Sequence, residues 1–148
     1  MKPDVDRFLE VAAAHLMMKI APALGAGYEQ ANAMGLGALL MAVREENDRA
    51  AARRAEENTA LRALFGEAES VVQDAQLRTR LSGAASSSEG SLLVSELEAA
   101  NSTLRGLLIE LQAHVEELEG PDARSIEAAI WRELALSTER RKLSLGLF

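Results

Sequence analysis

Four leucines spaced seven residues apart constrain the fold of this chain more than any other feature. The four are Leu97, Leu104, Leu111 and Leu118, and the alternate helical positions between them hold Leu93, Ala100, Leu107 and His114. Spacings of four and three residues put these side chains on one face of a helix that packs along its length against another helix. The pattern therefore predicts a long amphipathic helix from about Leu92 to Glu119.

The leucines of this helix are the predicted contact surface of the chain, here named the leucine seam. It consists of Leu93, Leu97, Leu104, Leu107, Leu111 and Leu118. Each fully buried leucine contributes roughly 1.5–3 kcal/mol, so we expect the seam to be covered. Two coverings remain open: other helices of the same chain, or the seam of a second copy.

The remaining composition predicts an all-α fold. Leu, Ala, Glu and Arg, which are strong helix formers, dominate the chain. Only five of the 148 residues are aromatic, and no segment shows the alternating pattern of a β-strand. We expect a helical bundle of five or six helices in a single domain, residues 1–148.

Breakers divide the chain into predicted helices. A first helix should run from Asp4 to about Ile20. Its inward stripe consists of Val5, Leu9, Ala12, Leu16 and Ile20, and Phe8 lies beside the stripe. A second should begin near Tyr28. A Gly- and Ser-rich stretch, residues 82–91, predicts a flexible linker between N-terminal helices in residues 1–81 and a C-terminal helical hairpin in residues 92–148.

The second predicted helix is apolar on nearly every side as far as Val43. A helix without a polar face is usually surrounded by others, so we expect it at the centre of the bundle. The charged stretch that follows, residues 45–58, is either its extension or a separate helix. Whether residues 28–65 form one helix or two therefore stays open, although Gly66 is a suitable C-cap.

Charge and residue usage exclude several classes of function. The net charge of −7 and the pI of about 4.9 disfavour nucleic-acid binding. The chain has no cysteine, and hence no disulfide, thiolate metal site or cysteine nucleophile. The start of the chain lacks the layout of a signal peptide, and the longest apolar stretch, residues 33–43, is too short to cross a bilayer. We expect a cytoplasmic protein without a membrane partner.

Three polar residues are candidates for chemistry. Glu46 and Glu133 lie on the inward faces of their predicted helices, and His114 occupies a core position of the heptad helix. Together they could form an acid–base or metal site, beside a pocket lined by Met17, Met34, Met41 and Trp131. However, the chain contains no Glu-x-x-His motif, as di-metal bundles require, nor any nucleophile or nucleotide motif. We therefore predict no catalytic residue, metal or cofactor.

The first sixty-odd residues resemble a family of small uncharacterised helical proteins of bacteria. The segments that carry the resemblance are residues 4–9, 20–24 and 31–43 and the pair Arg44-Glu45, with Glu46 in place of the family's leucine. Members of that family tend to accompany acyl-CoA dehydrogenases and aminoglycoside-phosphotransferase-like kinases. The resemblance implies a helper role beside such enzymes and transfers no catalytic residue.

Taken together, the sequence predicts a non-catalytic interaction protein, either a homodimer or a small partner subunit. The leucine seam and the absence of a catalytic motif are the basis for this prediction. The alternative is a small helical ligand- or metal-binding protein, or an enzyme, that uses Glu46, Glu133 and His114.

Overall fold

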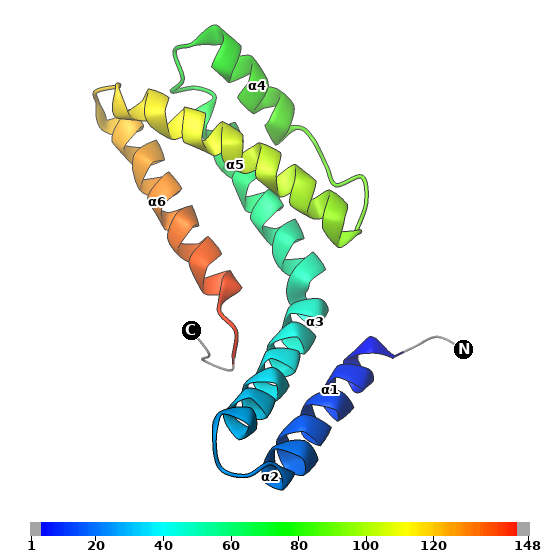
Figure 1. Ribbon diagram of the computed structural model, residues 1–148. Coiled ribbons are helices and arrows are strands. Elements are labelled where there is room, and N and C mark those ends of the chain that lie inside the picture. The colour runs from blue at the N-terminus through cyan, green and yellow to red at the C-terminus, as the bar shows by residue number, and fades with distance from the viewer. Residues whose placement is uncertain (1–3, 145–148) are drawn as a thin grey trace. The chain divides into compact units, whose positions relative to one another are not determined.

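The computed structural model describes residues 4–144, and every regular element in this part of the chain is a helix (Figure 1). The elements are α1 (Val5–His15), the π-helical turn η1 (Leu16–Ile20), α2 (Ala21–Ala23), α3 (Tyr28–Ala68), α4 (Ala75–Ala85), α5 (Val94–Glu116) and α6 (Pro121–Arg141). The predicted all-α fold is confirmed. The apolar residues Leu145, Leu147 and Phe148 lie outside the described residues.

The chain forms two compact units. The first comprises residues 1–50 and 142–148, as far as they are described, and the second comprises residues 51–141. The boundary falls within α3, which contributes its first part to one unit and its second part to the other. It does not fall at residues 82–91, where the sequence predicted a linker, because the helices on both sides of that stretch belong to the second unit.

Helix α3 is one continuous helix of 41 residues, which answers the question left open for residues 28–65. The charged stretch after Val43 extends the apolar helix because it contains many alanines and neither glycine nor proline. Gly66 does not end the helix as expected, since α3 continues to Ala68.

The described core of the first unit is a helical hairpin, formed by α1, η1, α2 and residues 28–50 of α3 (Figure 1). Asp4 caps α1 by accepting a hydrogen bond from the amide of Arg7 at 3.1 Å. The guanidinium of Arg44 on α3 donates two hydrogen bonds to the carboxylate of Asp6 on α1, at 2.6 and 3.0 Å. Gly37 lets the helices approach closely, because a methyl group added there would lie only 2.3 Å from Cγ of Met17.

The hairpin buries fewer side chains than the sequence predicted. On α1 the buried residues are Leu9 and Ala13, whereas Val5, Phe8 and Ile20, expected in or beside the inward stripe, are exposed. The apolar first half of α3 likewise exposes apolar side chains on its face away from α1. Within the described part of the first unit this helix is therefore not surrounded by others, contrary to the prediction. In a helical hairpin, the face that each helix turns away from its partner stays uncovered by that partner.

The second unit holds the main hydrophobic core. Helices α4 and α6 both pack against α5, and residues 51–68 of α3 complete the layer beneath it (Figure 1). The largest fully buried apolar side chains come from all four helices and the loop after α3: Phe65, Val72, Leu81, Leu97, Leu111 and Ile130. This core is built almost entirely of aliphatic residues, consistent with the five aromatic residues of the whole sequence.

The leucine seam is covered within the chain. Leu97, Leu104, Leu107 and Leu111 are buried and Leu118 is partly buried. Leu93 is the exception, because it precedes the first turn of α5 and is 61% exposed. Of the two coverings that the sequence left open, the structure shows the intramolecular one.

A second stripe on α5 is buried beside the seam. It consists of Asn101, Leu108 and Val115, which also alternate with the heptad leucines at spacings of four and three residues. The heptad pattern instead predicted Ala100, Leu107 and His114 as the core residues between the seam leucines. Of those three, only Leu107 is buried, and the other two are partly exposed.

The segment between α4 and α5 is anchored to α3. The guanidinium of Arg62 donates to the Ser87 hydroxyl at 2.9 Å and to the Glu89 carboxylate at 2.6 Å. Part of the predicted linker also extends α4 as far as Ala85. Within residues 4–144, every helix is too short or too polar to span a lipid bilayer.

Replacing Gly37 by alanine tests the close approach of α1 and α3. The added methyl group would crowd Met17 and lie 3.2 Å from the carbonyl oxygen of Ala13, so we expect a loss of about 1–3 kcal/mol in the stability of the hairpin. Gly35→Ala is the matched control, since its methyl group would meet nothing within 4 Å and should stabilise α3 by up to about 1 kcal/mol. Amide hydrogen exchange of α1 and α3 measures both effects, and equal protection in the two variants would contradict the close packing.

Replacing Leu111 by glutamate tests the intramolecular covering of the seam. Leu111 is fully buried, so a charged side chain there should abolish the cooperative unfolding transition of the second unit. Ile109→Glu serves as control, because Ile109 lies on the same helix and is 69% exposed. Circular dichroism during urea titration distinguishes the two. A folded but dissociated Leu111→Glu chain would instead place the seam between copies.

Candidate functional site

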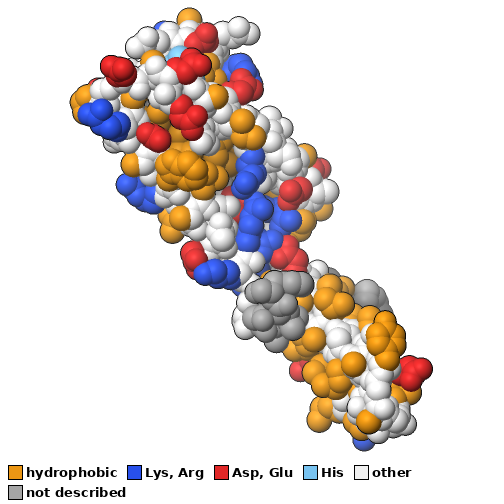
Figure 2. All heavy atoms as spheres, turned by 60° about the vertical axis from the view of Figure 1, so that its left-hand side comes forward, with side chains coloured by type: hydrophobic (Ala, Val, Ile, Leu, Met, Phe, Trp, Pro, Cys, Tyr) orange, Lys and Arg blue, Asp and Glu red, His pale blue; other side chains and the backbone are white. Residues whose placement is uncertain are grey.

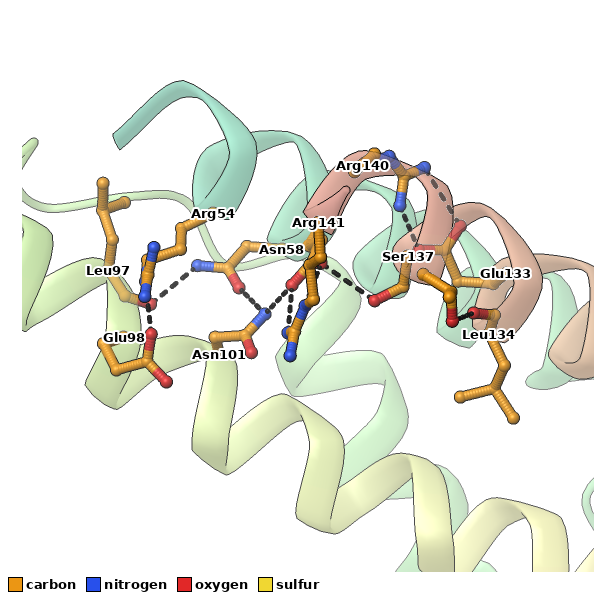
Figure 3. Close-up of polar contacts among 12 residues, drawn as sticks. Arg54, Asn58, Leu97, Glu98, Asn101, Glu133, Leu134, Ser137, Arg140 and Arg141 are labelled. Carbon is orange, nitrogen blue, oxygen red and sulfur yellow. Dashed lines mark hydrogen bonds and ion pairs between the residues drawn. The ribbon is translucent and has the colours of Figure 1, made fainter. Parts of the chain in front are cut away.

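The largest group of buried polar side chains lies in the second unit, where α3, α5 and α6 meet (Figure 3). We call it the buried polar layer, and it consists of Glu57 and Asn58 on α3, Asn101 on α5, and Ser137 and Arg141 on α6. Glu57 is only 2% exposed and Asn58 is fully buried. In a core that is otherwise aliphatic, a buried carboxylate and two buried amides need an explanation.

Glu57 is the centre of the layer. Its carboxylate accepts two hydrogen bonds from the Arg141 guanidinium, at 2.9 and 2.7 Å, and one from the Ser137 hydroxyl at 2.8 Å. The side-chain amide of Asn101 donates a further bond at 3.2 Å. Burial alone would raise the pKa of Glu57, but the guanidinium of Arg141 and the hydroxyl of Ser137 outweigh it and lower the pKa from 4.5 to about 2. The carboxylate is therefore ionised at neutral pH.

The two asparagines connect the carboxylate to α5. Figure 3 shows their side chains pointing toward each other: the amide nitrogen of Asn101 donates to the carbonyl oxygen of Asn58 at 2.9 Å. The amide nitrogen of Asn58 in turn donates to the backbone carbonyl of Leu97 at 3.2 Å. No buried side-chain nitrogen or oxygen among the described residues lacks a hydrogen-bond partner.

This arrangement is suited to structure rather than to catalysis. A general base needs a carboxylate that reaches a substrate and has a pKa near the working pH. Glu57 has neither property, since it is buried, saturated with donors and ionised over the whole physiological range. The layer instead fixes how α3, α5 and α6 align, because any shift would leave a buried charge without its partners.

Sequence reasoning missed the buried polar layer, although signals were present. Glu57 lies four residues before Leu61 and seven before Leu64, so it continues the inward stripe of α3 into the charged stretch. Asn101 similarly lies midway between Leu97 and Leu104 on the second stripe of α5.

Of the three residues of the predicted polar site, Glu133 and His114 have hydrogen-bond partners of their own. Glu133 is buried and accepts hydrogen bonds from Arg140 at 2.6 and 3.3 Å (Figure 3). His114 accepts a bond from the backbone amide of Gln73 at 3.2 Å through Nε2. Glu46 belongs to the first unit, whereas Glu133 and His114 belong to the second and have separate partners. No three His, Asp or Glu side chains among residues 4–144 are grouped so that they could hold a metal ion.

The residues expected to line a methionine and tryptophan pocket belong to both units. Met17, Met34 and Met41 belong to the first unit and Trp131 to the second, where it is exposed. A hollow of about 250 Å³ lies in the first unit; its lining residues are Asp6, Met41, Arg44, Glu45, Asp48 and Ser144.

Three charged groups of that hollow, those of Asp6, Arg44 and Glu45, are bonded within the chain. Asp6 is paired with Arg44, and Glu45 accepts hydrogen bonds from the hydroxyl and the amide of Ser144, which lower the pKa of Glu45. The backbone carbonyl of Lys142 also accepts a bond from Arg49 at 3.0 Å. These contacts attach residues 142–144 to α3.

Exposed apolar side chains are the most unusual surface feature of the first unit. In the lower part of Figure 2, hydrophobic side chains cover the hairpin and few charged side chains interrupt them. The large ones that are more than a third exposed are Val5, Phe8, Val11, Met18, Ile20, Tyr28, Met34, Leu36, Leu39 and Val43. Between residues 8 and 43 the only Asp, Glu, Lys or Arg residues are Glu10, Lys19 and Glu29. Large apolar side chains exposed singly are ordinary in soluble proteins, but this number on one small unit is unusual.

No family model, no curated protein and no solved structure matches the chain. The proposed function therefore rests on the residues of this chain.

Replacing Glu57 by glutamine tests the buried polar layer through pH. Because folding lowers the pKa of Glu57 from 4.5 to about 2, its stabilising contribution is complete above pH 4.5 and is lost as the pH falls toward 2. Glu57→Gln should lower the free energy of unfolding at pH 7 by about 1–3 kcal/mol and reduce its dependence on pH in that range. Urea titrations at several pH values measure both effects.

Glu110→Gln is the matched control for that experiment. Glu110 forms an ion pair with Arg80 on the surface of the same unit, where solvent screens the interaction. Its replacement should change stability at pH 7 little. If Glu57→Gln kept the full pH dependence of the parent protein, the assignment of the layer's charge to Glu57 would be wrong.

Proposed function

We propose that this protein is a non-catalytic helical interaction protein that forms a homodimer through the exposed apolar faces of its hairpin. The observation that carries the proposal is the set of large apolar side chains that α1 and residues 28–43 of α3 expose. Burying each such side chain would contribute roughly 1.5–3 kcal/mol. The two aromatic members, Phe8 and Tyr28, can each bury about 150–250 Å², and a standard interface requires about 800 Å² per partner.

The choice of a second copy as the occupant follows from charge. The hairpin carries three charged residues between positions 8 and 43, so it offers little to a strongly charged partner. Two copies that meet through this surface would bring together nearly neutral faces, although the whole chain carries a net charge of −7. The sequence left open whether the leucine seam is covered within the chain or by a second copy. The proposal places the dimer contact at the hairpin, since the seam is buried in the chain's own core.

The resemblance of the first sixty-odd residues extends this proposal to a helper role. In that role the dimer would accompany acyl-CoA or phosphotransferase-like enzymes and would supply a binding surface rather than a catalytic group. Support for the non-catalytic part comes from Glu57 and Glu133, whose buried carboxylates are bonded to arginines within the chain.

Sedimentation velocity over a range of protein concentrations tests the proposed dimer. The double variant Phe8→Glu/Leu39→Glu places a charge on both helices of the hairpin at exposed positions. Because each substitution occurs twice in a symmetric dimer, the dissociation constant should rise by about 100-fold or more.

The matched control is Leu92→Glu/Ile109→Glu, which makes the same kind of change at exposed aliphatic residues of the second unit. It should leave the dissociation constant unchanged, and circular dichroism should show that both double variants remain helical. A parent protein that sediments as a monomer at all concentrations would overturn the proposal, as would equal weakening by the two double variants.

A further inference from the structure

The first half of α3 carries an outward stripe that is distinct from the face it presents to α1. The stripe consists of Leu36, Leu39 and Val43, which are 55%, 50% and 53% exposed. Spacings of three and four residues put these side chains on one face of the helix. Gly37, which contacts Met17, lies on a different face, so the stripe points away from the contact with η1.

Polar residues bound this stripe symmetrically. Asn32 lies seven residues before Leu39 and Glu46 seven residues after it, so both share its face of the helix. A two-fold axis through Leu39 that pairs two α3 helices in antiparallel orientation would place Asn32 of each copy beside Glu46 of the other. The amide of Asn32 can donate a hydrogen bond to that carboxylate.

A parallel arrangement lacks this complementarity. It would place Asn32 beside Asn32 and Glu46 beside Glu46, and it would align the two helix dipoles, which opposes association. The antiparallel arrangement instead sets Leu36 of one copy near Val43 of the other, with Leu39 meeting its own equivalent at the axis. Gly35 and Ala31, at the edge of the stripe, provide small side chains for a close approach.

We infer that the dimer contact is an antiparallel pairing of residues 32–46 of α3 with the same residues of a second copy, centred on Leu39. The inference rests on the proposed function and specifies which part of the hairpin forms the contact. It assigns Asn32 and Glu46 to the selection of orientation and Leu36, Leu39 and Val43 to the apolar contact.

Single cysteines test this arrangement cleanly, because the chain has no cysteine of its own. Disulfides form where two Cα atoms lie about 4.4–6.8 Å apart. Under mild oxidation, Leu39→Cys should form a linked dimer with itself. Asn32→Cys and Glu46→Cys should each remain unlinked alone and should link to each other when mixed. One of the two variants carries an extra tag, so that the mixed dimer has its own mobility on a non-reducing gel.

The outcomes separate this inference from the proposed function. Linked dimers of Asn32→Cys alone or Glu46→Cys alone would show a parallel contact, and linked Phe8→Cys with unlinked Leu39→Cys would place the contact on α1. Either result overturns the antiparallel pairing and leaves the proposed dimer intact. So does the absence of any link in the cysteine variants when the parent protein sediments as a dimer. A parent protein that sediments as a monomer overturns both.

Discussion

The second unit depends on the need to cover α5 on two sides at once. Its leucine seam and the stripe of Asn101, Leu108 and Val115 lie next to each other, so one partner helix cannot bury both. Helices α4 and α6 and the second part of α3 supply the additional surfaces, and the fully buried Phe65 and Ile130 fill the space between them. The four-helix arrangement follows from this requirement, and with it the loss of the seam as a contact between copies.

Within that aliphatic core, the buried polar layer supplies what leucines cannot. Leucine side chains pack against one another in many registers with similar energy, whereas a buried carboxylate is tolerated only where its donors are in place. Glu57 therefore requires the end of α6 to bring Arg141 and Ser137 to it, and α5 to bring Asn101. The layer defines one alignment of three helices, and the lowered pKa of Glu57 ties the stability of this alignment to pH.

The sequence was sufficient for the class of fold because composition and breakers act locally. Asp4 caps α1, and Gly120 and Pro121 separate α5 from α6 as their conformational preferences predict. Which of two neighbouring stripes is buried could not be predicted, since Leu107 and Leu108 differ by one position and only tertiary packing distinguishes them. The burial of the polar residues could not be predicted for a related reason. In the sequence Glu57 resembles its solvated neighbours, and only the positions of Arg141 and Asn101 after folding make its burial tolerable.

The first unit shows how an apolar sequence misleads when a chain is considered alone. A helix without a polar face predicted a central position. In the described part of the first unit, however, α3 meets α1, η1 and residues 142–144, and apolar side chains on its other face stay exposed. The apolar side chains of α3 that were predicted to be buried are exposed in the single chain. Another molecule could cover them, which is the basis of the proposed dimer.

The close approach of Met17 to Gly37 limits which residues can replace these two during evolution. The Met17 side chain occupies the space that any larger residue at position 37 would need, so the two positions share one fixed volume. Enlarging one is compatible with this helix spacing only if the other shrinks by a similar amount. We therefore expect the pair to vary jointly among descendants of this chain, with their summed side-chain size nearly constant while each identity drifts.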